Sequence, residues 1–265
     1  MSDVADLGAL LDLAKSAAVR AGTQLVESVD AADRSYVHNA KLPREVKAAA
    51  DVALERDILG ALADSQLAVL SEESGYIPPH KPSNLWFIVD PLDGTFNFVK
   101  GLGPCAVSIA LWEDQRPIFG VIYDLMEEQL AWGGAGMGAF IDGRPISISS
   151  TSTLAMASIC TGFPVRFDIE SDQSMRYFWR LVSPFAKVRM IGSAAVALLN
   201  VARGSADVYL EQSIMLWDVA AGIAIVQGAG GAAAFRRNEV EWSYDVIASN
   251  VTLMPQVPGA QRIGK

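Results

Sequence analysis

Apolar residues recur at helical spacing in the first part of the chain. Between residues 4 and 29, leucines and alanines fall three or four positions apart, as in Leu7, Leu10, Leu11 and Ala14. The same spacing returns between residues 45 and 63. A repeat of three to four residues places apolar side chains along one face of a helix. The pattern therefore predicts that two amphipathic helices open the chain.

The rest of the chain contains short apolar runs bounded by turn residues, which is the pattern of β-strands. The expected strands cover residues 67–70, 85–89, 106–111, 118–124 and 129–132. After a stretch rich in serine and threonine at 148–154, strands (158–162, 187–190, 206–210, 232–235) alternate with helices (171–182, 194–203, 218–227). Such alternation predicts layered sheets with helices between or outside them. We expect an N-terminal α+β subdomain over residues 1–147 and a C-terminal α/β subdomain over residues 148–265.

The composition is that of a folded protein, and the charge narrows the class of partner. Of the 265 residues, 51% are hydrophobic and 19% are charged, far from the composition of disordered chains. The formal net charge of −9 argues against a nucleic-acid or membrane partner, because both are negatively charged. An anionic substrate would need local positive charge, which a bound divalent cation can supply.

Neither a signal peptide nor a membrane span is expected. Residues 1–22 lack a basic start followed by an apolar run, and no stretch reaches the roughly 18 uninterrupted apolar residues of a transmembrane helix. Cys105 and Cys160 are not spaced as metal ligands or as a redox pair, and His38 and His80 are too isolated to predict a zinc site. These observations predict a cytoplasmic protein.

Two aspartates at the end of a buried strand give the strongest local signal for chemistry. The strand at 85–89 leads into Asp90-Pro91-Leu92-Asp93-Gly94-Thr95. Both carboxylates can face one cation, and hard oxygen ligands of this kind favour magnesium. Gly94 leaves room for its own amide and that of Thr95 to meet phosphate oxygens. An isolated motif of this type is more commonly a turn, so further acidic positions decide its weight.

Three further acidic residues lie in comparable places. Glu72 follows the preceding strand, Asp218 precedes an apolar helix, and Asp51 falls on the second predicted helix. Two of them have a simpler interpretation: Asp218 is first of all a candidate helix N-cap, and Asp51 is a candidate solvated carboxylate. Their agreement with Asp90 and Asp93 nevertheless predicts a cage of four carboxylates, formed by Glu72, Asp90, Asp93 and Asp218.

Taken together, these blocks make the sequence resemble the inositol monophosphatase family. Members of this family are magnesium-dependent, lithium-sensitive sugar-phosphate phosphatases. The matching blocks, in family order, are 49–51, 72–75, 90–95 with Asn97-Phe98, 192–195 and 217–222. The resemblance implies the αβαβα sandwich of the inositol monophosphatase/fructose-1,6-bisphosphatase type. It also implies a homodimer and two or three Mg²⁺ ions per subunit.

The resemblance further implies a set of metal ligands. Glu72, Asp90 and the carbonyl of Leu92 would hold one ion, and Asp90, Asp93 and Asp218 would hold a second. Asp90 would then bridge the two ions. The chemistry agrees, because paired cations activate a water and neutralise the charge that builds on the attacking and leaving oxygens.

The remaining matches imply catalytic and substrate-binding roles. Asp51 and Thr95 would orient the attacking water, with help from Glu72, and the amides of Gly94 and Thr95 would bind the phosphate. Other positions match those that contact the hydroxyl-bearing ring of the substrate, namely Gly192, Ser193, Ala194 and Glu211. Lys41 matches, with less clear spacing, a lysine near the phosphate.

The expected function is hydrolysis of a small phosphorylated polyol, with myo-inositol 1-phosphate as the leading substrate because Glu211 can accept hydrogen bonds from ring hydroxyls. Histidinol phosphate, fructose 1,6-bisphosphate and 3′-phosphonucleotides stay open. The chain departs from the family pattern at Ser71, Phe96, Lys100 and residues 101–104. These departures spare every expected ligand and bear on the substrate alone.

Two other classes are weighed against this one. Haloacid dehalogenases also use an aspartate turn, but their two acidic residues are separated by one residue, whereas two lie between Asp90 and Asp93. A binding or regulatory protein on the same fold would have lost a metal ligand or one of the water-orienting residues. All of these positions are filled here, which favours an enzyme.

Overall fold

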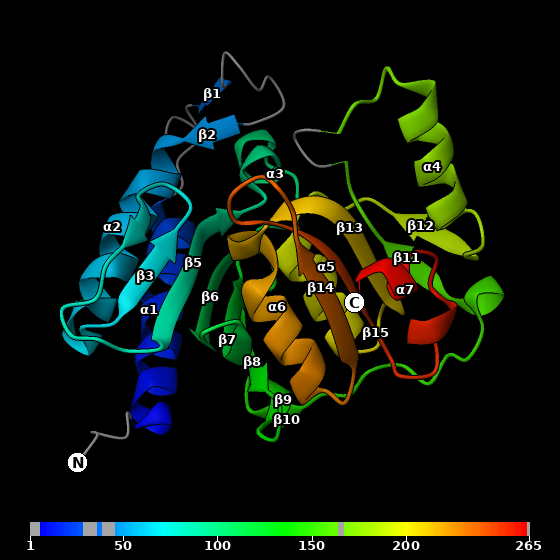
Figure 1. Ribbon diagram of the computed structural model, residues 1–265. Coiled ribbons are helices and arrows are strands. Elements are labelled where there is room, and N and C mark those ends of the chain that lie inside the picture. Colours follow the sequence, from blue (N-terminus) through cyan, green and yellow to red (C-terminus); the bar gives the residue numbers. More distant parts are fainter. Residues whose placement is uncertain (1–5, 29–35, 39–45, 164–166, 264–265) are drawn as a thin grey trace.

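Helices and two β-sheets alternate in five layers (Figure 1). The computed structural model describes residues 6–28, 36–38, 46–163 and 167–263. The helices are α1 (Leu7–Ser28), α2 (Ala49–Leu62), α3 (Thr95–Lys100), α4 (Asp172–Val182), α5 (Ala194–Ala202), α6 (Leu216–Gly228) and α7 (Ala260–Ile263). Short 3-10 turns lie at Ala63–Ser65, Leu154–Met156 and Met254–Gln256.

The larger sheet has eight strands in the order β10-β9-β8-β7-β6-β5-β3-β4. Their bounds are β3 (Ala68–Ser71), β4 (Gly75–Ile77), β5 (Leu85–Asp93), β6 (Ala106–Glu113), β7 (Arg116–Asp124), β8 (Gln129–Gly134), β9 (Gly138–Ile141) and β10 (Arg144–Pro145). β3 runs parallel to β5, and the other neighbours are antiparallel. The ends of β3 and β5 therefore meet at one edge of the sheet, which places their acidic residues close together.

The smaller sheet has five strands in the order β12-β11-β13-β15-β14. Their bounds are β11 (Ser158–Cys160), β12 (Lys187–Arg189), β13 (Val208–Met215), β14 (Ala232–Arg237) and β15 (Ser243–Ser249). A separate pair, β1 (Tyr36–His38) and β2 (Val46–Ala48), leads into α2. The larger sheet ends at Pro145 and the smaller begins at Ser158, so we propose residue 147 as the boundary between two subdomains.

Three apolar clusters hold the layers together. α1 and α2 pack on one face of the larger sheet, against side chains such as Phe87 and Phe119. α5 and α6 fill the space between the two sheets, where Trp112 from one sheet and Tyr209 from the other belong to the same cluster. α4 and α7 cover the outer face of the smaller sheet, around Leu210. This succession of layers confirms the predicted αβαβα sandwich.

Small residues bring α6 very close to the larger sheet. A Cβ on Gly120 of β7 would lie 2.1 Å from the carbonyl oxygen of Ala221 in α6, so no larger side chain fits at position 120. A Cβ on Gly222 would lie 2.4 Å from the side chain of Leu198 in α5. The helix is thus fixed against β7 and α5, and its first turn, which contains Asp218, has a defined position beside the sheet.

Several predicted boundaries are wrong in detail. β5 extends to Asp93, beyond its predicted end at residue 89, and its pairing with β6 shifts between Asp90 and Asp93. The helix predicted over 45–63 begins at Ala49, because residues 46–48 form β2. The helix predicted from Asp218 begins at Leu216. The sequence patterns did not predict β1, β4, α3 or β15, although β15 is a buried inner strand of the smaller sheet.

Candidate active site

Three carboxylates converge at the edge of the larger sheet. Glu72, Asp90 and Asp218 each offer an oxygen, and these oxygens all lie within 4.8 Å of one another. Glu72 directly follows β3, and its amide donates to the carbonyl of Val89 at 3.2 Å. Asp90 lies within β5, and Asp218 within the first turn of α6. Three elements distant in sequence thus bring their charges together.

Asp93 lies beside this group but is held by a different element. Its carboxylate accepts hydrogen bonds from the amides of Ala194 (3.2 Å) and Ala195 (2.8 Å) and from the hydroxyl of Ser193. These groups form the start of α5, where free N–H groups stabilise negative charge. Ser193, predicted to contact substrate, also accepts from the amide of Val196 and caps α5.

The pKa values reflect how unfavourable this concentration of charge is. Burial, followed by the charges of Glu72, Asp93 and Asp218, raises the pKa of Asp90 well above its usual value. Burial and the charge of Glu72 do the same for the pKa of Asp218. Burial raises the pKa of Asp93 to about 6, even though its hydrogen bonds to Ser193 and to the amides of α5 act in the opposite direction. Such mutual repulsion is what a bound cation would relieve.

The donor set fits a hard divalent cation. The available groups are carboxylate oxygens together with the carbonyl of Leu92. This carbonyl accepts a hydrogen bond from the Thr95 hydroxyl at 3.0 Å. Asp90 is oriented by the amide of Leu92, which donates to its Oδ1 at 3.0 Å. Oxygen donors of this type suit magnesium, calcium or manganese better than softer metals. A bound ion of this class supplies an acidified water and neutralises negative charge on phosphate oxygens.

Asp51 and Thr95 form a pair next to the carboxylates. Asp51 is only 3% exposed, so its interpretation as a solvated carboxylate is wrong. Its Oδ2 accepts from the amide of Ala48 at 2.6 Å. Its Oδ1 lies 3.2 Å from the Thr95 hydroxyl, whose single proton is shared between Asp51 and the carbonyl of Leu92. One oxygen therefore fixes the carboxylate at the start of α2, while the other faces the hydroxyl that is predicted to orient water.

Gly94 and Gly192 bring two loops into contact. Both have left-handed backbone conformations, with φ of 87° and 77°. A Cβ on Gly94 would lie 2.9 Å from the carbonyl oxygen of Pro104 and 3.2 Å from that of Gly192. Glycine at position 94 therefore satisfies both the backbone conformation and the close approach. The predicted phosphate-binding loop and the predicted ring-binding loop are neighbours in space.

Glu211 points between the sheets from β13. It is buried, and its Oε2 accepts from the hydroxyl of Tyr209 at 3.0 Å. Burial raises its pKa to about 7, and the charge of Asp93 acts in the same direction. A Cβ on Gly162 would lie 2.9 Å from its Oε1, so a glycine there leaves space for the carboxylate. Within the described residues, no protein group donates a hydrogen bond to Oε1 of Glu211. This oxygen is therefore available as an acceptor on the side of Asp93.

Two supporting contacts were not predicted. Asn97 is buried and donates through Nδ2 to the carbonyls of Pro104 and Ile191, both at 2.8 Å, which ties together the loops on either side of Gly94. Glu55 accepts from the amide (2.9 Å) and the hydroxyl (2.6 Å) of Ser74, which anchors the turn after Glu72. Glu55 lies four positions after Asp51, and this helical spacing was the available signal. Lys41 lies outside the described residues.

The departures from the family pattern lie around this site. Ser71 is fully buried at the end of β3, and its hydroxyl has no hydrogen-bond partner among the residues described. Phe96 is 48% exposed, and the ammonium of Lys100 lies 5.6 Å from the centre of its ring. An exposed aromatic ring and a lysine thus lie on α3, next to the glycine turn.

The layered fold and its acidic site at the edge of the larger sheet are those of a family of phosphatases. A family model described as "Inositol monophosphatase family" matches residues 6–259, so the chain belongs to this family. This is a phosphatase family whose members are generally metal-dependent.

Relatives agree in sequence and in structure. The chain is 34% identical to the "Nus factor SuhB" of Pseudomonas aeruginosa over 227 residues, which cover 84% of this chain and 83% of that protein. It is 39% identical to the "Inositol-1-monophosphatase" of Synechocystis over 164 residues, 62% of this chain and 57% of the relative. The inositol monophosphatase of Anabaena (Nostoc) superimposes with a TM-score of 0.81 at 32% identity, covering 97% of this chain and 96% of the other.

None of the helices in the described residues combines the length and the apolar character needed to cross a bilayer.

Proposed function

We propose that this protein is a magnesium-dependent phosphomonoesterase that hydrolyses a small polyol phosphate. The observation that carries the proposal is the convergence of Glu72, Asp90 and Asp218 within 4.8 Å, beside the Thr95–Asp51 hydrogen bond. Such a site combines a place for hard cations with a hydroxyl and a buried carboxylate that can handle a proton. Hydrolysis by an activated water needs both.

In this proposal, each residue of the site has a distinct role. Two or three Mg²⁺ ions would be held by Glu72, Asp90, Asp93, Asp218 and the Leu92 carbonyl. The Thr95 hydroxyl, held by Asp51, orients the attacking water, and Asp51 accepts the proton through Thr95. The amides of Gly94 and Thr95, at the start of α3, donate to the phosphate oxygens.

Substrate choice is assigned to the β13 side of the site. We propose myo-inositol 1-phosphate as the substrate, with Glu211 accepting from ring hydroxyls and residues 192–194 lining the ring. The Synechocystis relative, named as an inositol-1-monophosphatase, supports this choice. A relative from Aquifex aeolicus carries the name "Fructose-1,6-bisphosphatase/inositol-1-monophosphatase", so fructose 1,6-bisphosphate is the first competing substrate. Parallel turnover assays that add histidinol phosphate and a 3′-phosphonucleotide decide among them.

A regulatory function is the second candidate, because several relatives carry the name "Nus factor SuhB". Such a function would engage other macromolecules. The net charge of −9 makes direct contact with nucleic acid unfavourable over most of the surface. The carboxylates expected of a working enzyme are also all present. Turnover of any of the four substrates would establish that the enzyme function is retained.

We extend the proposal to a homodimer. Four exposed large apolar side chains lie on or directly after α4 and β12, namely Met175, Trp179, Val188 and Met190. Large apolar side chains in such numbers mark an interaction surface.

Turnover is expected to require magnesium and to be inhibited by lithium and by excess magnesium. Without a cation, the carboxylates repel the phosphate as well as each other. Exhaustive chelation should therefore remove activity, and added magnesium should restore it. Full activity after chelation, measured as phosphate release, would rule out the metal-dependent mechanism.

Glu211→Ala is expected to separate recognition from chemistry. The change removes a hydrogen-bond acceptor for ring hydroxyls, so kcat/KM for myo-inositol 1-phosphate should fall by about 10-fold or more, given the strength of hydrogen bonds to charged groups. Hydrolysis of glycerol 2-phosphate, which has no ring, should fall much less. Equal losses for both substrates would assign Glu211 a structural role instead.

A further inference from the structure

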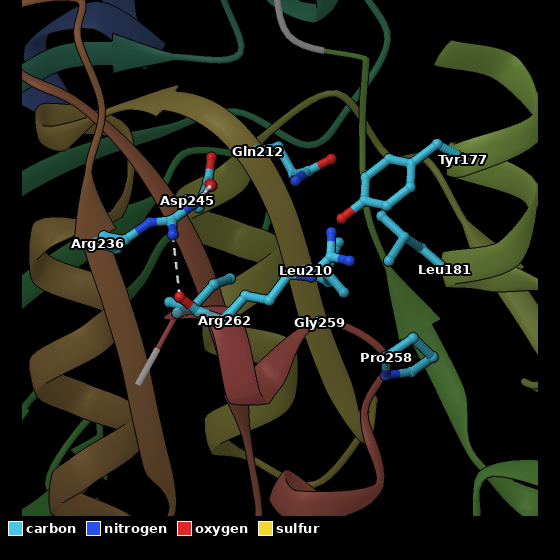
Figure 2. A pocket seen from close by; sticks show the side chains of 10 residues that line it. Tyr177, Leu181, Leu210, Gln212, Arg236, Asp245, Pro258, Gly259 and Arg262 are labelled. Carbon is cyan, nitrogen blue, oxygen red and sulfur yellow. Dashed lines mark hydrogen bonds and ion pairs between the residues drawn. The ribbon is translucent and has the colours of Figure 1, made fainter. Parts of the chain in front are cut away.

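A cavity lies on the face of the smaller sheet that α4 and α7 cover (Figure 2). It has a volume of about 180 Å³ and is enclosed by β13, β14 and β15 together with α4 and α7. Pockets for drug-sized ligands usually exceed about 300 Å³, so this one suits a molecule of only a few heavy atoms. Its polar lining consists of Tyr177, Gln212, Arg236, Asp245 and Arg262.

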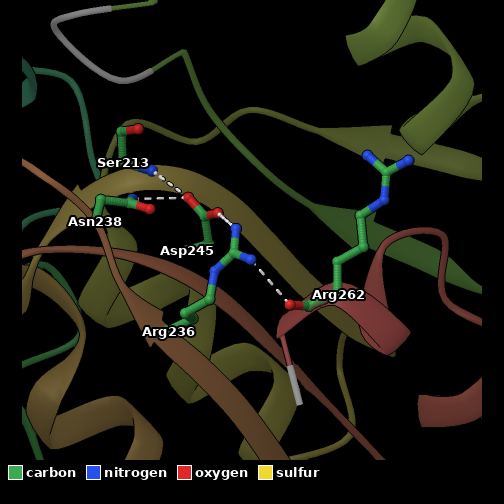
Figure 3. A network of polar contacts seen from close by, with 5 residues as sticks. All are labelled: Ser213, Arg236, Asn238, Asp245 and Arg262. Atoms are coloured by element: carbon green, nitrogen blue, oxygen red, sulfur yellow. Dashed lines mark hydrogen bonds and ion pairs between the residues drawn. The ribbon is translucent and has the colours of Figure 1, made fainter. Parts of the chain in front are cut away.

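The single carboxylate in this lining, that of Asp245, is neutralised by an ion pair with Arg236 (Figure 3). Asp245 accepts from the amide of Ser213 (3.1 Å), from Nδ2 of Asn238 (2.8 Å) and from Nη2 of Arg236 (3.1 Å). Its side chain is 8% exposed, whereas that of Arg236 is 49% exposed. Arg236 also donates through Nη1 to the carbonyl of Arg262 at 3.1 Å, which fixes α7 against β14. The Arg236–Asp245 pair therefore adds no net charge to the cavity.

Arg262 supplies a second guanidinium, which forms no ion pair with any residue that the structure describes. Figure 2 shows its side chain directed toward the hydroxyl of Tyr177, away from Asp245. In the described part of the chain, no carboxylate lies within ion-pair distance of it. With Asp245 neutralised by Arg236, the cavity carries a net positive charge in a protein whose overall charge is −9.

The other walls are apolar. Leu181 from α4, Leu210 from β13 and Ile263 from α7 line the cavity and are themselves largely buried. A guanidinium binds a carboxylate through two parallel hydrogen bonds, and the apolar side chains can cover a short hydrocarbon tail. We propose that this cavity binds a small aliphatic carboxylate. Arg262 holds the carboxylate, the Tyr177 hydroxyl and the Gln212 amide donate to it, and the leucines cover its tail.

Butyrate is the probe that tests this site. The 265-residue protein, loaded with magnesium, is titrated with butyrate while the amide signals of Gln212 and Gly259 are followed by NMR. Saturable shifts are expected at these residues. Arg262→Gln should weaken binding by about 10-fold or more, because it removes a charge-assisted hydrogen-bond donor. The substitution leaves the backbone carbonyl that Arg236 contacts in place.

Two controls test whether butyrate binds inside the cavity and through its charge. Arg180→Gln changes an exposed arginine of α4 outside the cavity, and it should bind butyrate as the unmodified protein does. Butyramide has nearly the same shape without the charge and should not bind. The proposal fails if butyrate causes no saturable shifts at Gln212 and Gly259, if Arg262→Gln binds it unchanged, or if butyramide binds equally well. Coordination of butyrate at the magnesium site would shift Gly94 and Thr95 and would persist in Arg262→Gln, which also counts against the cavity.

Discussion

Asp218→Asn is expected to lower turnover by about 100-fold or more while the protein stays folded. The change removes a charged oxygen from the proposed metal site but keeps the size of the side chain. Loss of an outer-shell partner alone commonly costs about 10-fold to 100-fold in metal affinity or activity, and loss of a direct ligand should cost more. Asparagine can still accept from the amide of Met215, the bond that Asp218 makes at 3.3 Å, so α6 should keep its start.

The same change should stabilise the protein in the absence of metal. Burial and the charge of Glu72 raise the pKa of Asp218, so its ionised form is unfavourable in the folded state. Asp93→Asn is expected to behave in the same way in the turnover assay. Melting temperature without metal and turnover at saturating magnesium are the paired measurements, with Asp64→Asn, at an exposed position, as the matched control. Near-normal turnover of Asp218→Asn would leave Asp218 with only its role in the first turn of α6.

Metal-free protein is expected to be more stable at pH 5 than at pH 8, and Glu211 should account for part of the difference. Its pKa is about 7 in the folded protein, against an ordinary value of 4.5. Between these two values the folded state binds more protons than the unfolded state, so the free energy of unfolding falls as the pH rises. At 1.36 kcal/mol per pKa unit, this difference corresponds to about 3 kcal/mol at pH 8.

Glu211→Gln isolates that contribution. Glutamine keeps an oxygen that can accept from Tyr209 but carries no charge to bury. The variant should be more stable than the unmodified protein at pH 8, and most of this advantage should be lost at pH 5, as measured by urea denaturation without metal. Glu239→Gln, at an exposed position between β14 and β15, should show no such pH dependence. An equal effect of Glu211→Gln at both pH values would mean that Glu211 is not protonated in the folded state.

The convergence of Glu72 and Asp90 was predictable because each of them marks the end of an apolar run. Glu72 and Asp90 each follow a run of strand residues, and two parallel strands that are neighbours in a sheet end at the same edge. The resemblance to a known family then linked Asp218 to them. The end of β5 was not predicted. The strand continues through a bulge between Asp90 and Asp93, but its proline and the following glycine are typical of a turn.

Contacts between distant segments could not be predicted from local patterns. Asp218 as an N-cap was a reasonable expectation, but tertiary packing starts α6 at Leu216 and places Asp218 inside the first turn. The hydrogen bonds that the start of α5 donates to Asp93 join residues about 100 positions apart. The cavity proposed to bind a small carboxylate is lined by residues from four elements, namely Tyr177, Gln212, Asp245 and Arg262. No spacing rule relates these positions, so only the fold reveals them.

The alternation of side chains along β13 makes the two sites depend on a single strand register. Tyr209 and Glu211 face α5 and the group of acidic residues, whereas Leu210 and Gln212 face the cavity proposed to bind a small carboxylate. A slip of one residue in the pairing of β13 with β15 would exchange these faces. Glu211 would then lie beside Arg262 as an internal counter-ion, and Gln212 would face the proposed substrate ring. A single-residue deletion or insertion in this strand would therefore disable both sites at once, so the two can diversify only by substitution.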